Sequence, residues 1–135
     1  MASELRVNTL KDASGNNSVA TSTVAQGSAK GWVNFDGTGT PAVRDSFNCS
    51  IFSDNGTGDY TISFSNSLSN ANYSSTMSCG QDSTGNSGLR AANGLSSTTR
   101  TTGVIRIGTA TASSTANRTS IDDNTISLSI HGDLT

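Results

Sequence analysis

The stretch Lys30–Phe64, KGWVNFDGTGTPAVRDSFNCSIFSDNGTGDYTISF, decides the fold of this chain. It holds all four phenylalanines, the only tryptophan and one of the two tyrosines. Two glycine-rich turns, DGTGT at 36–40 and DNGTGD at 54–59, divide it into three short segments that predict strands. Because large side chains are scarce elsewhere, we expect this stretch to be the folding centre of the protein.

The composition of the whole chain favours polar β-structure. Ser, Thr, Asn and Gly make up 70 of the 135 residues, whereas Leu, Ile, Val and Phe make up only 24. So few apolar residues would indicate disorder if the net charge were high, but 13% of residues are charged and the net charge is −2. Threonine suits the half-buried surface of a strand, and Gly, Asn, Asp and Ser suit turns. We therefore expect an all-β fold.

The shortage of large apolar residues also leaves a single copy with a small core. Ordering one residue costs about 1.5 kcal/mol, and apolar burial returns about 25 cal/mol per Å². Association of several copies buries further surface and stabilises the folded state. We therefore predict that the protein is an oligomer.

The sequence predicts neither membrane insertion nor secretion. It lacks a run of about 20 apolar residues, and its first residues, MASELRVNTLKD, lack the apolar segment of a signal peptide. We expect synthesis in a cytoplasm, where Cys49 and Cys79 would be reduced; a disulfide between them stays open if their strands are adjacent. The acidic balance and the absence of a basic stripe disfavour nucleic-acid binding.

We expect two units, an extended N-terminal arm at residues 1–25 and a β-domain at residues 26–135. The arm contains no aromatic residue and too few apolar residues to make a core of its own. We interpret it as a segment that lies against another surface or ties several copies of the chain together. Its apolar residues Leu5, Val7 and Leu10 are the candidate attachment and oligomerisation contacts.

Short alternating runs predict the strands. In the arm we expect two weak strands, at 5–10 and 18–24, around a turn at 11–17. In the β-domain the expected strands are Ala29–Phe35, Val43–Ser53, Tyr60–Ser65, Tyr73–Cys79, Gly103–Gly108 and Thr125–His131. No segment keeps a helical period for long enough to predict a helix. Short strands between turn clusters are typical of an antiparallel β-sandwich.

Two polar segments, Gln81–Asn93 and Thr109–Ser120, predict long loops at the edges of the domain. In or near them lie Arg90, Arg100 and Arg118. Their guanidinium groups suit carboxylates or phosphates of a bacterial surface polysaccharide, so they are the candidate host-ligand contacts. The alternative is that these arginines are simply solvated.

Other chemistry has little support. The turn at 54–59 does not have the spacing of a calcium loop, and Asn55-Gly56 is a common hairpin pair. His131 is the only histidine and has no acid or nucleophile near it in the sequence. No paired acids, catalytic triad or phosphate loop occurs, so we expect no enzyme, no metal and no cofactor.

The aromatic residues leave a choice between packing and recognition. Trp32, Tyr60 and Tyr73 would stack on sugar rings if they were exposed, because their flat faces offer a large contact area. Each is flanked by apolar or small residues. This setting favours core packing for all three.

The segment at 32–64, WVNFDGTGTPAVRDSFNCSIFSDNGTGDYTISF, resembles one that is common in tail-fibre and related virion proteins of tailed bacteriophages, especially phages of cyanobacteria and marine bacteria. NANY at 70–73 fits the same pattern, as do the arginine-bearing strand at 104–108 and the last strand at 126–132. SELRVNTL at 3–10 resembles the N-terminal segment of many such chains.

The resemblance implies a homotrimeric, β-structured fibre or fibre-like protein that is made in the host cytoplasm, becomes part of the virion and is attached through its N-terminus. We expect a short tail fibre or tail-associated fibre protein. Its partners would be its own copies, tail or baseplate proteins and host surface polysaccharide. The alternatives are a capsid decoration, cement or head-fibre protein, and a lectin-like receptor-binding module.

Overall fold

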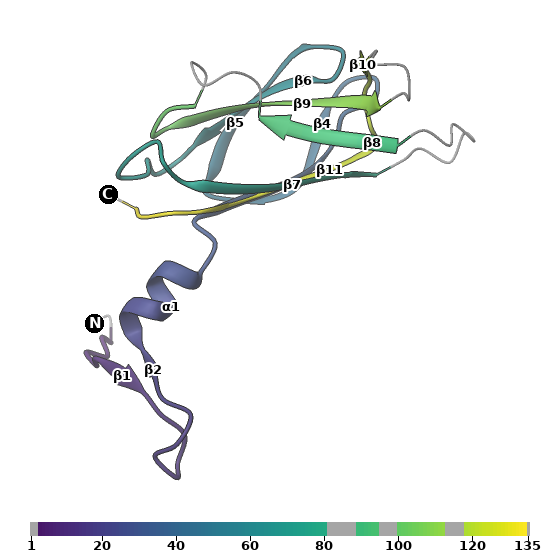
Figure 1. Ribbon diagram of the computed structural model, residues 1–135. Helices are drawn as coiled ribbons and strands as arrows, with labels where there is room; N and C mark the ends of the chain where they lie inside the picture. Colours follow the sequence, from purple (N-terminus) through teal and green to yellow (C-terminus); the bar gives the residue numbers. More distant parts are fainter. Residues whose placement is uncertain (1–2, 81–88, 95–99, 113–117, 135) are drawn as a thin grey trace.

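The computed structural model describes residues 3–80, 89–94, 100–112 and 118–134, and most of them lie in antiparallel strands. The elements in chain order are β1 (Thr9–Leu10), β2 (Val19–Ala20), α1 (Thr21–Gly27), β3 (Gly31–Asp36), β4 (Ala42–Phe47), β5 (Cys49–Gly56), β6 (Asp59–Phe64), β7 (Ser74–Gly80), β8 (Leu89–Gly94), β9 (Val104–Ala112), β10 (Arg118–Ser120) and β11 (Thr125–His131). Figure 1 shows them. The predicted all-β class is confirmed.

Two sheets make up the body, by which we mean the described chain from Lys30 onward. One sheet has the strand order β4-β3-β11-β7, and the other has the order β10-β9-β6-β5 with β8 paired to β9. β1 and β2 form a separate two-stranded hairpin outside the body. The chain therefore alternates between the sheets, and segments far apart in sequence pair side by side, as when β11 pairs both β3 and β7.

One apolar core joins the two sheets. The four-stranded sheet contributes the inward residues of β3 and β11, and the other sheet contributes those of β6 and β9. These fully buried side chains include Phe35, Tyr60, Ile62, Ile105, Ile107, Ile126, Leu128 and Ile130. The rings of Phe35 and Tyr60 meet across the sheets with centroids 5.0 Å apart. The alternation predicted for the last strand is confirmed, since Ile126, Leu128 and Ile130 of β11 are buried and the residues between them are not.

The predicted strand Val43–Ser53 is wrong in one respect, because Asn48 divides it into β4 and β5 and sends the chain from one sheet to the other. Asn48 has a φ of 56°, in the left-handed region that asparagine tolerates. Its amide nitrogen donates to the carbonyl oxygens of Lys30 at 2.8 Å and Asn66 at 3.1 Å. Its side-chain oxygen accepts from the Asn66 N–H at 2.7 Å. These bonds hold the corner between the sheets.

Hydrogen bonds link the turns at one end of the body. The carboxylate of Asp122 accepts from the Gly58 N–H and from the Tyr60 hydroxyl, each at 2.7 Å. The Gly37 N–H donates to the Asp123 carbonyl oxygen at 2.9 Å. Burial raises the pKa of Tyr60, and the neighbouring Asp122 acts in the same direction. The acidic pair lies before β11, as predicted, in the short connection between β10 and β11.

Trp32 lies on the outer face of the four-stranded sheet, so its predicted core packing is wrong. The next residue, Val33, points inward and is 2% exposed, and side chains alternate along a strand. The cross-strand neighbour of Trp32 is Phe47, which is 52% exposed. Tyr60 and Tyr73 do lie in the core, at 0% and 3% exposure.

The two polar segments predicted as loops carry strand at their described ends. β8 occupies residues 89–94, β9 continues to Ala112, and β10 pairs with the end of β9. The sequence shows no apolar alternation here because the buried residues are small or polar. Thr109 and Ala110, for example, are only 1% and 6% exposed. These strands form by backbone pairing with the two edges of β9, which no hydrophobic pattern in the sequence indicates.

The second strand predicted in the arm, at 18–24, is also largely wrong. Only Val19–Ala20 is strand, and the chain then forms helix α1, which runs past the predicted boundary at residue 25 to Gly27. None of its seven residues is buried. A helix this short gives no detectable apolar period, and a single turn or two of helix is marginal alone. Among the described residues there is no helix with the length and apolar character needed to cross a membrane.

Candidate functional site

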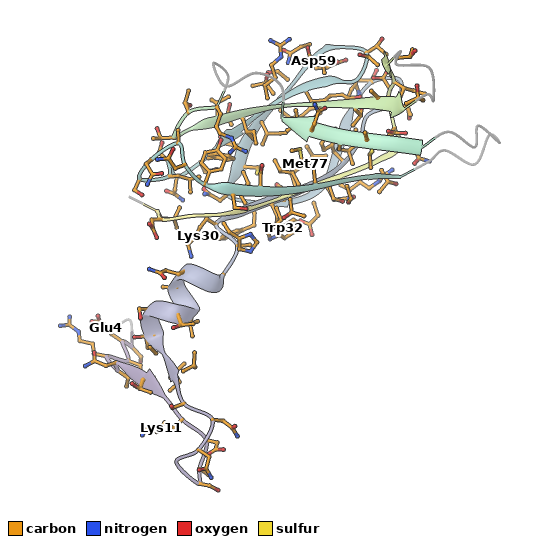
Figure 2. All side chains as sticks on the ribbon, in the orientation of Figure 1. Glu4, Lys11, Lys30, Trp32, Asp59 and Met77 are labelled. Carbon is orange, nitrogen blue, oxygen red and sulfur yellow. The ribbon has the colours of Figure 1, made fainter. Side chains whose placement is uncertain are left out.

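The arm projects from the body as a hairpin followed by a helix (Figure 1). From Ser3 to Ser28 no residue is buried, and only Val19 and Thr21 are even half-buried. Figure 2 labels Glu4 and Lys11 on this hairpin, well away from the sheets. The body therefore covers none of the described arm.

Apolar side chains on the arm are left in solvent. The candidate attachment residues Leu5, Val7 and Leu10 are 79%, 39% and 43% exposed, and Val24 on α1 is 46% exposed. All three predicted residues thus lie where another protein or another copy can reach them. Burying such side chains is favourable by about 1.5–3 kcal/mol each.

The hairpin has a defined local shape in spite of this exposure. The Asp12 carboxylate accepts from the Ser14 and Asn16 N–H groups at 3.1 and 2.8 Å and from the Asn17 amide at 2.9 Å. At the other end of the hairpin the Thr21 N–H donates to the Asn8 carbonyl oxygen at 3.0 Å. The arm therefore presents its apolar residues on a folded hairpin.

Lys30 joins the helix to the body. It is only 9% exposed, and Figure 2 places it at the root of the arm. Its Nζ donates to the carbonyl oxygens of Ala25 and Ser28, the latter at 3.2 Å, and to the Ser28 Oγ at 2.8 Å. A cation at a helix C-terminus satisfies carbonyl groups that have no partner within the helix. This contact fixes the direction in which the arm leaves the sheets.

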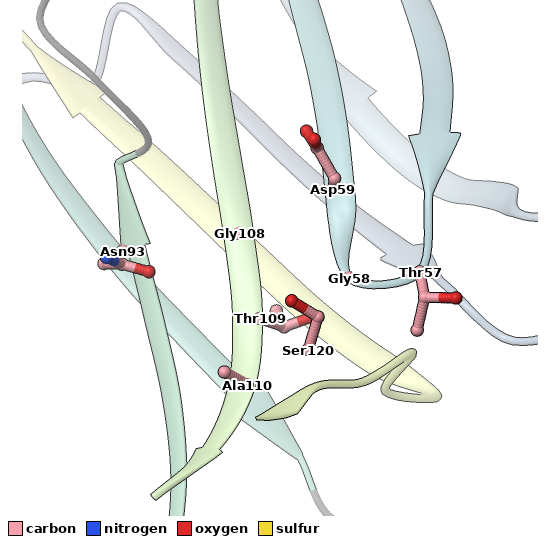
Figure 3. Close-up of a pocket in the computed structure, with 8 residues that line it drawn as sticks. All are labelled: Thr57, Gly58, Asp59, Asn93, Gly108, Thr109, Ala110 and Ser120. Atoms are coloured by element: carbon pink, nitrogen blue, oxygen red, sulfur yellow. The ribbon is translucent and has the colours of Figure 1, made fainter. Parts of the chain in front are cut away.

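A hollow of about 380 Å³ lies on the five-stranded sheet (Figure 3). Register explains its position: Gly108 of β9 pairs with Asp59 on one side and with Asn93 on the other. The next pair toward the end of β9 is Ala110 with Ser120. Small residues thus form the floor of the hollow, and polar side chains surround it.

An ion pair holds the carboxylate at the rim of the hollow. The Arg106 Nε donates to the Asp59 Oδ1 at 2.7 Å, and a second guanidinium nitrogen donates to Oδ2. Asn55 adds an amide donor at 3.3 Å. These donors, chiefly Arg106, hold the pKa of Asp59 below its ordinary value of 3.8, and the carboxylate raises the pKa of Arg106.

Of the three predicted ligand-binding arginines, the structure describes the side chain of Arg100 alone. Arg100 packs against the core edge, with its guanidinium 4.6 Å from the centre of the Tyr73 ring. It donates to the Tyr73 carbonyl oxygen at 3.0 Å and to the Ser75 Oγ at 2.6 Å. The backbones of Arg90 and Arg118 lie in β8 and β10, and their side chains fall outside the described residues.

The structure places the other sequence candidates apart from one another. Cys49 and Cys79 lie on β5 and β7, in different sheets, and carry thiols rather than a disulfide. Burial raises the pKa of Cys49 to about 11, so its thiolate is scarce at neutral pH. Within the described ranges no three His, Cys, Asp or Glu side chains gather as a metal site.

Sequence reasoning missed the residues around the hollow. Asp59 was interpreted only as part of a turn, and Arg106 only as one position in an apolar strand. The available signal was their alternation with the buried residues Tyr60, Ile105 and Ile107. A charged residue between two inward isoleucines must point outward, but only the register shows that it meets Asp59.

Comparison with known proteins adds no relative. No family model matches the chain, and neither a curated protein nor a solved structure does.

Proposed function

We propose that this protein is a virion structural protein, a short tail fibre or tail-associated fibre protein of a tailed phage. The arm at residues 1–25 attaches it to the tail or baseplate. The two sheets form a β-sandwich that projects outward and contacts the host surface. The observation that carries the proposal is the uncovered arm, a folded hairpin and helix whose apolar side chains are exposed and which has no buried residue in α1.

A homotrimer is part of the same proposal. Apolar exposure is not confined to the arm, since Phe47 and Val43 on β4 are 52% and 44% exposed. β4 is the edge strand of its sheet, and Phe47 lies beside the outward-facing Trp32. Neighbouring copies that cover these side chains and the arm would supply the apolar burial that one copy lacks. The sequence resemblance to phage fibre proteins supports three copies over two.

Labelling of phage particles tests the assignment. An antibody raised against the purified chain, carried on gold particles, is expected to mark the tail in electron micrographs of virions of the phage that encodes it. Label on the capsid would support the head-decoration alternative instead. Absence of the chain from purified particles, checked by mass spectrometry, would contradict a virion role.

Variants of the arm test whether its apolar residues attach the protein to the virion. Leu5→Ser combined with Leu10→Ser should reduce incorporation into particles, because both substitutions remove exposed apolar contact area. The matched control is Lys11→Ser, which changes an exposed polar residue of the same hairpin. Equal incorporation of both variants would show that the arm's apolar residues are not the attachment surface.

A further inference from the structure

The hollow at Gly108 faces away from the arm. The hairpin and α1 leave from the side of the body that carries β7 and β11, whereas β6, β9 and β10 lie on the opposite side (Figure 1). In a protein attached through its arm, the hollow is therefore on the side that meets the surroundings. This placement rests on the proposed function, whereas the chemistry of the hollow does not.

The pairing of the strands makes the hollow wide enough for the ring of a small ligand. Asp59, Gly108 and Asn93 form one row across three adjacent strands. Neighbouring strands are about 4.8 Å apart, so the outer two backbones are separated by roughly 10 Å with no side chain between them. The volume of about 380 Å³ is within the range, roughly 300–1,000 Å³, of sites that hold small ligands.

The polar groups around the floor suit a ligand with several hydroxyl groups. The Asp59 carboxylate offers about four acceptor positions; Arg106 takes two of them and Asn55 takes one, so about one stays open to a ligand. Asn93 contributes an amide, while Ser120 and Thr57 contribute exposed hydroxyls at the rim (Figure 3). Because Arg106 already holds the carboxylate in place, little side-chain entropy is lost when a hydroxyl donates to it.

Charge balance points to a neutral ligand. The negative charge of Asp59 is matched by the guanidinium of Arg106, and the other lining residues that the structure describes are uncharged. An anionic ligand would meet the carboxylate at the rim without an unpaired cation in the described lining to receive it. A neutral hydroxyl-rich ring meets no such cost.

We propose that the hollow formed by Asp59, Asn93, Gly108 and Ser120 binds a neutral sugar residue of a bacterial surface polysaccharide. One sugar hydroxyl donates to the remaining acceptor position of the Asp59 carboxylate, the amide of Asn93 bonds a further hydroxyl, and the ring lies over Gly108 and Ala110. The ligand thus differs from the carboxylates and phosphates that the arginines suggested.

The test uses the full purified chain and an array of neutral and uronic-acid-containing bacterial oligosaccharides, followed by calorimetric titration of any that bind. We expect saturable binding of a neutral oligosaccharide and a rise in Kd of about tenfold or more for Asn93→Ala and for Ser120→Ala combined with Thr57→Ala. Ser129→Ala, on the outer face of the other sheet, is the matched control and should bind normally. Circular dichroism confirms that each variant is folded.

Several outcomes overturn the proposal. These are binding of no neutral oligosaccharide, binding that the hollow variants leave unchanged, and a preference for acidic sugars that Arg100→Ala abolishes. A second arm titrates purified lipopolysaccharide against free capsular oligosaccharide, which separates the two sources of the same sugar chemistry. Sugar binding without incorporation into virions would remove the fibre assignment and leave the site; incorporation without sugar binding would do the reverse.

Discussion

At the scale of single residues, stability depends on positions where the backbone leaves no room for a side chain. Gly58 has a φ of +65° and lies against the backbone of Thr109 and Ile121, where an added Cβ would come within 2.9 Å of two Ile121 atoms. Its N–H also donates to Asp122. The turn therefore requires glycine both for its conformation and for its close packing.

Gly58→Ala is expected to lower the free energy of unfolding by about 2 kcal/mol or more, because left-handed strain and a backbone clash add. Chemical denaturation followed by circular dichroism measures the change. Gly27→Ala is the control, since an added Cβ there meets no atom within 4 Å. Similar stabilities for the two variants would contradict the tight packing of the turn.

The Asp59–Arg106 pair predicts a pH dependence with a definite sign. The pKa of Asp59 is lowered in the folded state, so its contribution to stability is present above the ordinary value of 3.8 and is lost as the pH falls through the folded-state pKa. Asp59→Asn should therefore be less stable than the natural chain at pH 7, and this difference should shrink as the pH falls from 3.8 through the folded-state pKa. Urea midpoints at pH 7 and across the acid range measure it.

A double-mutant cycle assigns this effect to the pair. If Arg106 is the chief partner, Arg106→Gln and Asp59→Asn should be clearly non-additive in the urea midpoint at pH 7. Additive changes would mean that the lowered pKa of Asp59 has another source. The partial exposure of both side chains, 38% for Arg106 and 23% for Asp59, keeps the expected effect modest.

At the scale of elements, apolar alternation decided which strands the sequence could predict. β3, β6 and β11 carry large inward side chains at every second position, and their predicted ranges agree with the structure within one or two residues. β8 and β10 lack that signal because small and polar residues form them. Their pairing depends on β9, which is a long-range condition that no local pattern contains.

The same limit explains the candidate site. The arm residues Leu5, Val7 and Leu10 could be proposed from the sequence because apolar side chains in a segment without a core imply a partner. The hollow was not found because its residues come from β6, β8, β9 and β10, and the residue that creates it, Gly108, has no side chain to signal it. Asn48 lies between these two cases. Asparagine is a familiar turn residue, but the flanking residues made the segment look like one continuous strand.

The contact between Lys30 and the C-terminus of α1 can be tested by substitution. Lys30→Met keeps the apolar stem but removes the donors to Ala25 and Ser28. Amide hydrogen exchange in α1 should then become faster, because the helix C-terminus loses its side-chain partners and its connection to the body. Lys11→Met serves as the control, and unchanged exchange in α1 for Lys30→Met would show that the contact does not hold the helix.

At the scale of the whole molecule, the body and the arm divide the apolar residues between them. The body buries Phe35, Tyr60 and the inward isoleucines in one core, whereas the arm and the edge strand β4 leave apolar side chains in solvent. Trp32 lies at the root of the arm (Figure 2) beside Phe47. The side nearest the arm is therefore suited to contacts between copies, and the far side, with its hollow, to contacts with a ligand.

The mass of the intact chain in solution tests this account most directly. Size-exclusion chromatography with multi-angle light scattering at micromolar concentration should give three times the 13.8 kDa chain mass, because three copies cover the apolar residues that one leaves exposed. Leu5→Ser with Phe47→Ser should shift the population toward single chains. A well-folded particle of 13.8 kDa for the natural sequence would contradict the proposed trimer.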